Sequence, residues 1–99
     1  MKALTLALLI ALSTPTMAAF TPKLCSDLSN TAATIMEKRQ GGVAMVRIMD
    51  IMGDSKIMQA VVLDAYEVRR HPAPMWQERE IDDFRDKWYL ACYKSRKGN

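Results

Sequence analysis

The sequence is poor in the side chains from which most catalytic and metal sites are built. Its 99 residues include one histidine and two cysteines. Structural zinc sites usually take four cysteine or histidine ligands, so this inventory is too small for one. Cys25 and Cys92 are also too far apart to form the C-x-x-C motif of a redox site. A catalytic thiol needs a partner base, and His71 is the only histidine available. We therefore predict no catalytic residue, no metal and no cofactor.

An excess of one charge sign is also nearly absent. Fourteen Lys and Arg residues against eleven Asp and Glu residues give a formal net charge of +3. This weak basicity does not indicate nucleic-acid binding. The basic end KSRKGN, 94–99, is short, and we expect at most weak contact with an anionic membrane surface from it. No internal repeat, low-complexity tract or alternating run of strand length is present.

The first residues of the sequence have the pattern of an export signal. A lysine is followed by an uncharged apolar run, 3–12, and the small residues Thr16 and Ala18 precede a candidate cleavage point. This is the pattern of a bacterial secretory signal peptide. Ten apolar residues are too few for a membrane anchor, because crossing the ~30 Å hydrocarbon core takes about 20. We predict a signal peptide over 1–18, a single domain over 19–99, and a periplasmic location.

The two cysteines lie near the two ends of the predicted mature chain. In an oxidising compartment, two and only two cysteines most often pair. A Cys25–Cys92 bridge closes a loop of 67 residue steps, which on the chain-entropy treatment contributes on the order of 4 kcal/mol. The core of so small a domain usually contributes only a few kcal/mol. We therefore predict this disulfide and expect folding to depend on it.

Apolar residues at three- and four-residue spacing predict short helices separated by glycine and proline. Helices are expected at about 22–39, 43–52, 55–69 and from 74 onward. The apolar stripe predicted for the last helix consists of Ile81, Phe84, Trp88, Ala91 and Cys92. Two antiparallel helices of matched length would bring the cysteines together. The predicted fold is a small all-α bundle of about four helices, with the first and last joined by a disulfide.

Three methionines share one face of the predicted second helix. Met45, Met49 and Met52 are spaced i, i+4 and i+7. Methionine fills irregular gaps in cores and also makes adaptable binding surfaces. Thioethers are Cu(I) ligands, but no histidine or dense M-x-M cluster accompanies these three. A core role is favoured for them and for Met36, Met58 and Met75, with a docking surface and a Cu(I) site as the alternatives.

Three aromatic residues lie off the predicted apolar stripe. Trp76 follows the proline turn, and Tyr89 and Tyr93 are four residues apart on the last helix. Packing in the core or at a helix end is favoured for them. Exposed aromatics beside arginine are enriched at protein interfaces. Trp76, Tyr89 and Tyr93 are therefore candidate partner-binding residues, together with the three methionines.

The remaining chemically active groups have simple structural explanations. His71 lies in RRHPAP, 69–74, and is predicted to be an exposed turn residue. A general acid–base role would need a second group, and the sequence nominates none. The carboxylates in the first half of the last helix are predicted to form a solvated face, because acidic residues there suit the helix dipole.

The sequence resembles small exported proteins encoded by phages and prophages of proteobacteria. The residues that carry the resemblance are Cys25, TIMEKRQGGV at 34–43, the methionine-rich segment, AYEVRR at 65–70 and WYLAC at 88–92. These motifs have no known chemistry, so the resemblance assigns no role to any residue. It implies a short exported accessory protein that acts on the host envelope.

The expected function is therefore that of a non-enzymatic protein-binding module of the bacterial envelope, whose partner is an envelope or periplasmic protein. It would mask a receptor, or neutralise an enzyme or toxin. A periplasmic stress chaperone is the alternative, because protonating every carboxylate and His71 gives the mature domain about +14 and strong self-repulsion. Cu(I) binding through Met45, Met49 and Met52 comes third.

Overall fold

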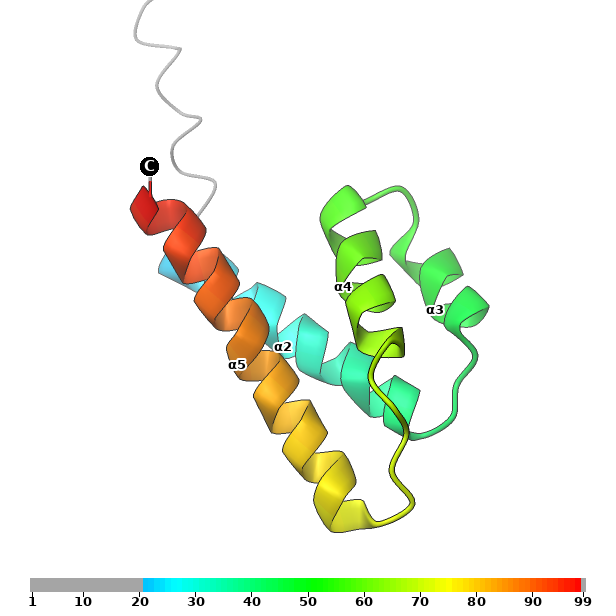
Figure 1. The fold of residues 1–99 in the computed structure, drawn as a ribbon. Helices are drawn as coiled ribbons and strands as arrows, with labels where there is room; N and C mark the ends of the chain where they lie inside the picture. Colours follow the sequence, from blue (N-terminus) through cyan, green and yellow to red (C-terminus); the bar gives the residue numbers. More distant parts are fainter. Residues whose placement is uncertain (1–20, 99) are drawn as a thin grey trace, which may run out of the picture.

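The computed structural model describes residues 21–98, with side chains to residue 96. Within this range the chain forms four helices and no strand: α2 (Pro22–Gln40), α3 (Met45–Met52), α4 (Lys56–Tyr66) and α5 (Pro74–Gly98). The long helices α2 and α5 run antiparallel, α4 packs on α2, and α3 packs on α4 (Figure 1). The predicted all-α fold is confirmed. The predicted signal peptide, 1–18, lies outside the described residues.

Two of the helices begin at hydroxyl side chains that cap free backbone N–H groups. Thr21 Oγ1 accepts a hydrogen bond from the Leu24 N–H at 3.1 Å, and Pro22 occupies the first turn of α2. Ser55 Oγ accepts from the Met58 N–H at 3.3 Å at the start of α4. Such caps satisfy donors that have no partner inside the helix, and each stabilises its helix by about 1 kcal/mol.

The end of α2 sets the beginning of α3. Gly42 has a φ of 87°, a left-handed conformation that glycine adopts without a steric cost. The N–H groups of Gly42 and Val43 donate back to the carbonyls of Arg39 and Lys38 at 3.1 and 3.0 Å. This pair of bonds is the Schellman motif. Because Val43 belongs to this motif, α3 begins at Met45 and not at residue 43 as predicted.

Helix α4 is shorter than the sequence pattern predicts. It ends at Tyr66, whereas the apolar spacing suggested a helix to residue 69. The carbonyls of Val68 and Arg69 accept hydrogen bonds from the side chains of Arg39 and Gln40 at 2.9 and 2.8 Å. Tertiary hydrogen bonds to α2 therefore hold this backbone where the pattern alone favoured another helical turn.

All four helices contribute to one apolar core. Its buried members are Ala32, Ile35, Met36, Ile48, Val61, Val62, Ala65 and Phe84. Ala32 of α2 and Ala65 of α4 are both fully buried in it. Phe84 is the buried contribution of α5, and Ile81 and Trp88 pack beside it as partly buried residues.

On α5, two residues predicted to face the core are exposed. Ala91 lies one position before Cys92, which turns it about 100° away from the buried face of α5. Met75 is 69% exposed. It precedes Phe84 by nine residues, which places it on the opposite side of the helix. Within residues 21–98, no helix is both long and apolar enough to span a bilayer.

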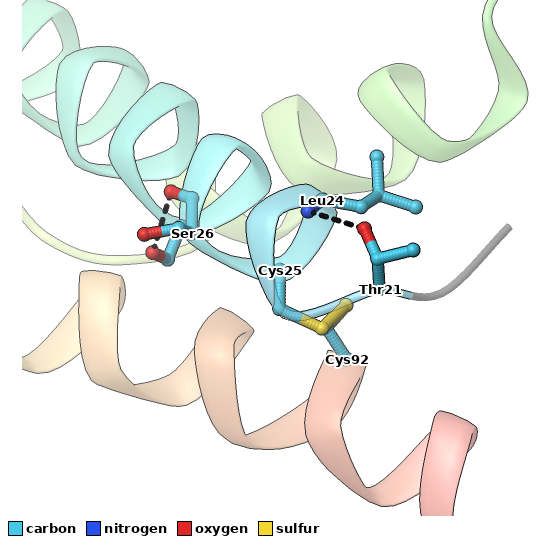
Figure 2. Close-up of a disulfide and its surroundings, with 6 residues drawn as sticks. Thr21, Leu24, Cys25, Ser26 and Cys92 are labelled. Carbon is cyan, nitrogen blue, oxygen red and sulfur yellow. Dashed lines mark hydrogen bonds between the residues drawn. A yellow bond between two sulfur atoms is a disulfide. The ribbon is translucent and has the colours of Figure 1, made fainter. Parts of the chain in front are cut away.

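A disulfide fastens the open end of the α2–α5 hairpin. Cys25 lies in the first turn of α2 and Cys92 near the end of α5, and their Cα atoms are 5.5 Å apart (Figure 2). Both cysteines are buried, at 1% and 4% exposure. The predicted pairing is confirmed. The bridge joins the two ends of the domain, so α3 and α4 lie within the loop that it closes.

Candidate functional site

A buried glutamine at the end of α2 holds the loop that leads into α5. Gln40 is 2% exposed. Its Nε2 donates to the carbonyl of Arg69, and its Oε1 accepts from the N–H of His71, both at 2.8 Å. The amide of this one side chain thus pairs with a backbone carbonyl and a backbone N–H of the loop, two groups that would otherwise need other hydrogen-bond partners. The loop before α5 is therefore fixed to the core and not only to its own neighbours.

The side chain of His71 is tied to α5. Its Nε2 lies 2.8 Å from Oε2 of Glu80, and its carbonyl accepts from Gln77 Nε2 at 2.6 Å. The imidazole side chain is only 16% exposed. The prediction of an exposed turn residue was wrong, because the turn after His71 folds α5 back so that its second turn meets the ring. The contact between Glu80 and this ring was not predicted from the sequence.

An exposed tryptophan, Trp76, lies beside the His71 ring. The Trp76 ring lies 6.4 Å from the His71 ring between centroids and tilts 33° from it, and the Arg79 guanidinium lies 5.4 Å from the Trp76 ring centroid. Trp76 is 48% exposed, and Met75 beside it is 69% exposed. We call Met75, Trp76 and Arg79 the tryptophan tip. It lies at the start of α5, at the opposite end of the α2–α5 hairpin from the disulfide (Figure 1).

A second exposed apolar surface lies further along α5. Tyr89, Leu90 and Tyr93 are 38%, 52% and 40% exposed. Together with Asp86 they line a shallow depression in the surface. The Arg96 guanidinium lies 5.2 Å from the Tyr93 ring centroid. We call Asp86, Tyr89, Leu90 and Tyr93 the tyrosine face.

The three methionines of α3 do not share one environment. Met49 and Met52 are half-buried and pack against the core beside Ile48, which is 4% exposed. Met45 is 39% exposed, so the core role that was favoured for it is wrong. The i, i+4 and i+7 spacing therefore brings two of the three thioethers to the core and leaves the third largely at the surface.

An apolar groove of about 300 Å³ runs beside the disulfide. It is bounded by Leu24 and Leu28 of α2, Ile57 and Met58 of α4, and Cys92 of α5. Leu24 and Ile57 are 41% and 48% exposed. At this end the starts of α2 and α4 lie apart, whereas the two helices come together toward their C-terminal ends (Figure 1).

The polar groups beneath these surfaces are satisfied. Among the described residues, every buried side-chain nitrogen and oxygen has a hydrogen-bond partner. No cluster of three His, Cys, Asp or Glu side chains arranged to hold a metal ion occurs in the same part of the chain. The Tyr66 hydroxyl donates to the carbonyl of Val43 at 2.7 Å. Burial raises the pKa of Tyr66, and the Arg39 charge above its ring partly opposes the rise.

One carboxylate connects α4 and α5. Asp64 accepts from Trp88 Nε1 at 3.0 Å and pairs with Lys87 Nζ at 2.8 Å. Helices α4 and α5 share few other contacts. Neither helical periodicity nor a local motif indicated that Asp64 would meet Lys87 and Trp88. Trp88 itself was correctly assigned to the inward-facing stripe.

Comparison with known protein families gives no match for this chain, and no curated protein or solved structure matches it either.

Proposed function

We propose that this chain is a non-enzymatic, exported protein-binding module of the bacterial envelope, and that the tryptophan tip makes the principal contact with its partner. The partner is an envelope receptor that the module masks, or a periplasmic enzyme or toxin that it neutralises. The signal-like start of the sequence and the Cys25–Cys92 bridge support an oxidising compartment, because disulfides persist there.

The observation that carries the proposal is the exposure of Trp76 on a fixed support. Tryptophan and arginine dominate the energetics of protein interfaces when they enter pockets of the partner. Trp76 is half exposed, although its neighbours His71 and Glu80 and the buried Gln40 are held by hydrogen bonds of 2.8 Å. A side chain held in its binding position loses less conformational entropy on association.

The tip also offers complementary polar contacts at its rim. Arg79 lies over the tryptophan ring, and Glu78 beside it lines a shallow polar depression. An apolar centre with charged groups around it is the usual anatomy of a protein interface. This composition favours a folded protein partner over an unfolded client.

The experiment compares capture by two variants of the mature, oxidised domain. Trp76→Ala removes the centre of the tip, and Leu63→Ala removes an exposed apolar side chain on α4 that is 49% exposed. Captured envelope and periplasmic proteins are identified by mass spectrometry, and binding of each purified candidate is then measured by calorimetry. We expect one saturable partner whose affinity falls at least tenfold with Trp76→Ala and is unchanged with Leu63→Ala. Equal affinities for all three proteins would contradict the proposal.

A second candidate function, acid-stress chaperone activity, is favoured by the position of Asp64. Its carboxylate is the acceptor for both Lys87 and Trp88 across the α4–α5 contact. Without the charge of this carboxylate the contact is weaker, and opening there would expose Val61, Val62 and Phe84. Protection of an acid-denatured client by the wild type at low pH, and by Asp64→Asn already near neutral pH, would identify this function.

A further inference from the structure

The outward side of α5 carries a small exposed apolar cluster. Tyr89, Leu90 and Tyr93 are all exposed, and the exposed carboxylate Asp86 lies four residues before Leu90. The inward side carries Phe84, which is buried at 4% exposure, and Cys92. A helix that has apolar residues on its outward side as well as on its inward side can bury a second surface against a partner. Leu90 and Tyr93 are three residues apart, which is one step of the spacing found in the seam of paired helices.

Charge is distributed unequally about the centre of this face. The carboxylates Asp83 and Asp86 precede Leu90, and the cation Lys94 follows it. Asp82 also precedes Leu90, but it is paired with Arg85 at 3.0 Å. Asp86 lies four residues before Leu90, and Lys94 lies four residues after it. Within residues 21–96, neither Asp86 nor Lys94 takes part in an ion pair. The nearby cation Lys87 is already paired with Asp64.

A second copy of this chain fits that pattern. When two identical helices pack antiparallel with a two-fold axis at Leu90, a residue before Leu90 on one copy faces the residue equally far after Leu90 on the other. Such an interface is isologous, so every contact occurs twice. Asp86 of each copy then faces Lys94 of the other, and Leu90 with Tyr89 and Tyr93 fills the centre. A parallel pairing would instead place Asp86 beside its own equivalent.

We propose that the domain forms a two-fold symmetric homodimer through the tyrosine face, with α5 of one copy antiparallel to α5 of the other. This inference goes beyond the proposed function, because it assigns the tyrosine face to self-association and leaves the tryptophan tip for the partner. The dimer carries two tips, so it binds a clustered partner with greater avidity than the single domain does.

The test uses charge reversals at the two paired positions. Asp86→Lys places lysine opposite lysine in a homodimer, and Lys94→Asp places aspartate opposite aspartate. Each variant alone is expected to be monomeric, with self-association at least tenfold weaker than that of the wild type. An equimolar mixture of the two restores both ion pairs and is expected to form a heterodimer. A misfolded variant could not regain association by mixing, so the result does not depend on the single variants alone.

Association is measured by sedimentation velocity of the mature, oxidised domain. The range runs from about 10 µM to about 1 mM, because interfaces smaller than about 1,200 Å² are usually weak. Leu90→Arg is expected to abolish the dimer, and Leu63→Arg, at a leucine of similar exposure on α4, to leave it intact. A wild type that stays monomeric over the whole range, or a mixture of the charge-reversed variants that stays monomeric, would overturn the proposal.

Discussion

Nε2 of His71 lies 2.8 Å from Oε2 of Glu80, and this contact joins the loop before α5 to the second turn of that helix. Trp76 lies between the two residues in sequence and packs beside the His71 ring. The pair is half-buried, so its hydrogen bond is less exposed to competing water than a surface pair would be. The position of the tryptophan tip therefore depends on a polar contact that the tip itself does not make.

Removing Glu80 should loosen the tip. Glu80→Ala leaves the half-buried His71 ring without its carboxylate partner, and we expect the free energy of unfolding to fall by about 1 kcal/mol. The indole N–H signal of Trp76 in two-dimensional NMR should move, while that of Trp88 stays in place. Glu78→Ala is the control, because this neighbouring carboxylate is exposed. Unchanged Trp76 signals in Glu80→Ala would show that the pair does not position the ring.

Gln40 should matter more for stability than an ordinary surface glutamine. Gln40→Ala leaves the N–H of His71 and the carbonyl of Arg69 without their partner in a partly buried site, and each such loss is costly. We expect a destabilisation of about 2 kcal/mol in denaturant unfolding. Gln59→Ala removes one exposed hydrogen bond to the carbonyl of Gly53 and should cost less than about 1 kcal/mol. Equal losses for the two variants would contradict the anchoring role of Gln40.

The disulfide should contribute a large share of the stability. It closes a loop of 67 residues, so its reduction restores chain entropy worth on the order of 4 kcal/mol to the unfolded state. Cys25→Ser and Cys92→Ser are each expected to give a poorly folded, protease-sensitive product. Thermal unfolding with and without reductant measures the effect directly. Equal midpoints in the two conditions would show that the helices hold together without the bridge.

Alkaline pH should destabilise the domain through Tyr66. Burial raises the pKa of Tyr66 in the folded state above its ordinary value of 10.0. The folded chain then retains this proton more strongly than the unfolded chain, so unfolding releases it and stability falls as pH rises above 10.0. Tyr66→Phe is less stable at neutral pH, because it lacks the hydroxyl bond to Val43, but it should lose less stability at high pH. Parallel stability curves for wild type and Tyr66→Phe would contradict this assignment.

The features that sequence reasoning placed correctly are those determined within about one helical turn. Pro22 and Ser55 mark helix beginnings, and Gly41 and Gly53 mark helix ends, because each acts on the backbone next to it. The disulfide was also predictable, because only two cysteines are present and they lie near the two ends of the predicted mature chain.

The contacts that were not predicted are side-chain hydrogen bonds between residues of different segments, which no helical spacing pattern relates to one another. Gln40 and His71 are 31 residues apart, and His71 and Glu80 are nine residues apart across a proline turn. Gln40 reads as an ordinary polar residue at a helix end until the loop folds back on it. Met75 was predicted to be in the core because it is apolar. It is exposed instead, because its position along α5 places it on the outward side of the helix. Candidate sites built from exposed residues therefore depend on packing that residue type alone does not determine.

Site-specific photo-crosslinking in a bacterial host that expresses the full-length protein tests most directly whether the tryptophan tip contacts a partner protein. A photoreactive amino acid replaces Met75, which is 69% exposed beside Trp76, in one variant and Leu63 in another, and adducts from the envelope and periplasm are identified by mass spectrometry. We expect one defined adduct with another protein from position 75, which disappears in competition with the untagged wild-type domain, and none from position 63. The same adducts from both positions, or none from position 75, would show that the tryptophan tip does not contact a partner.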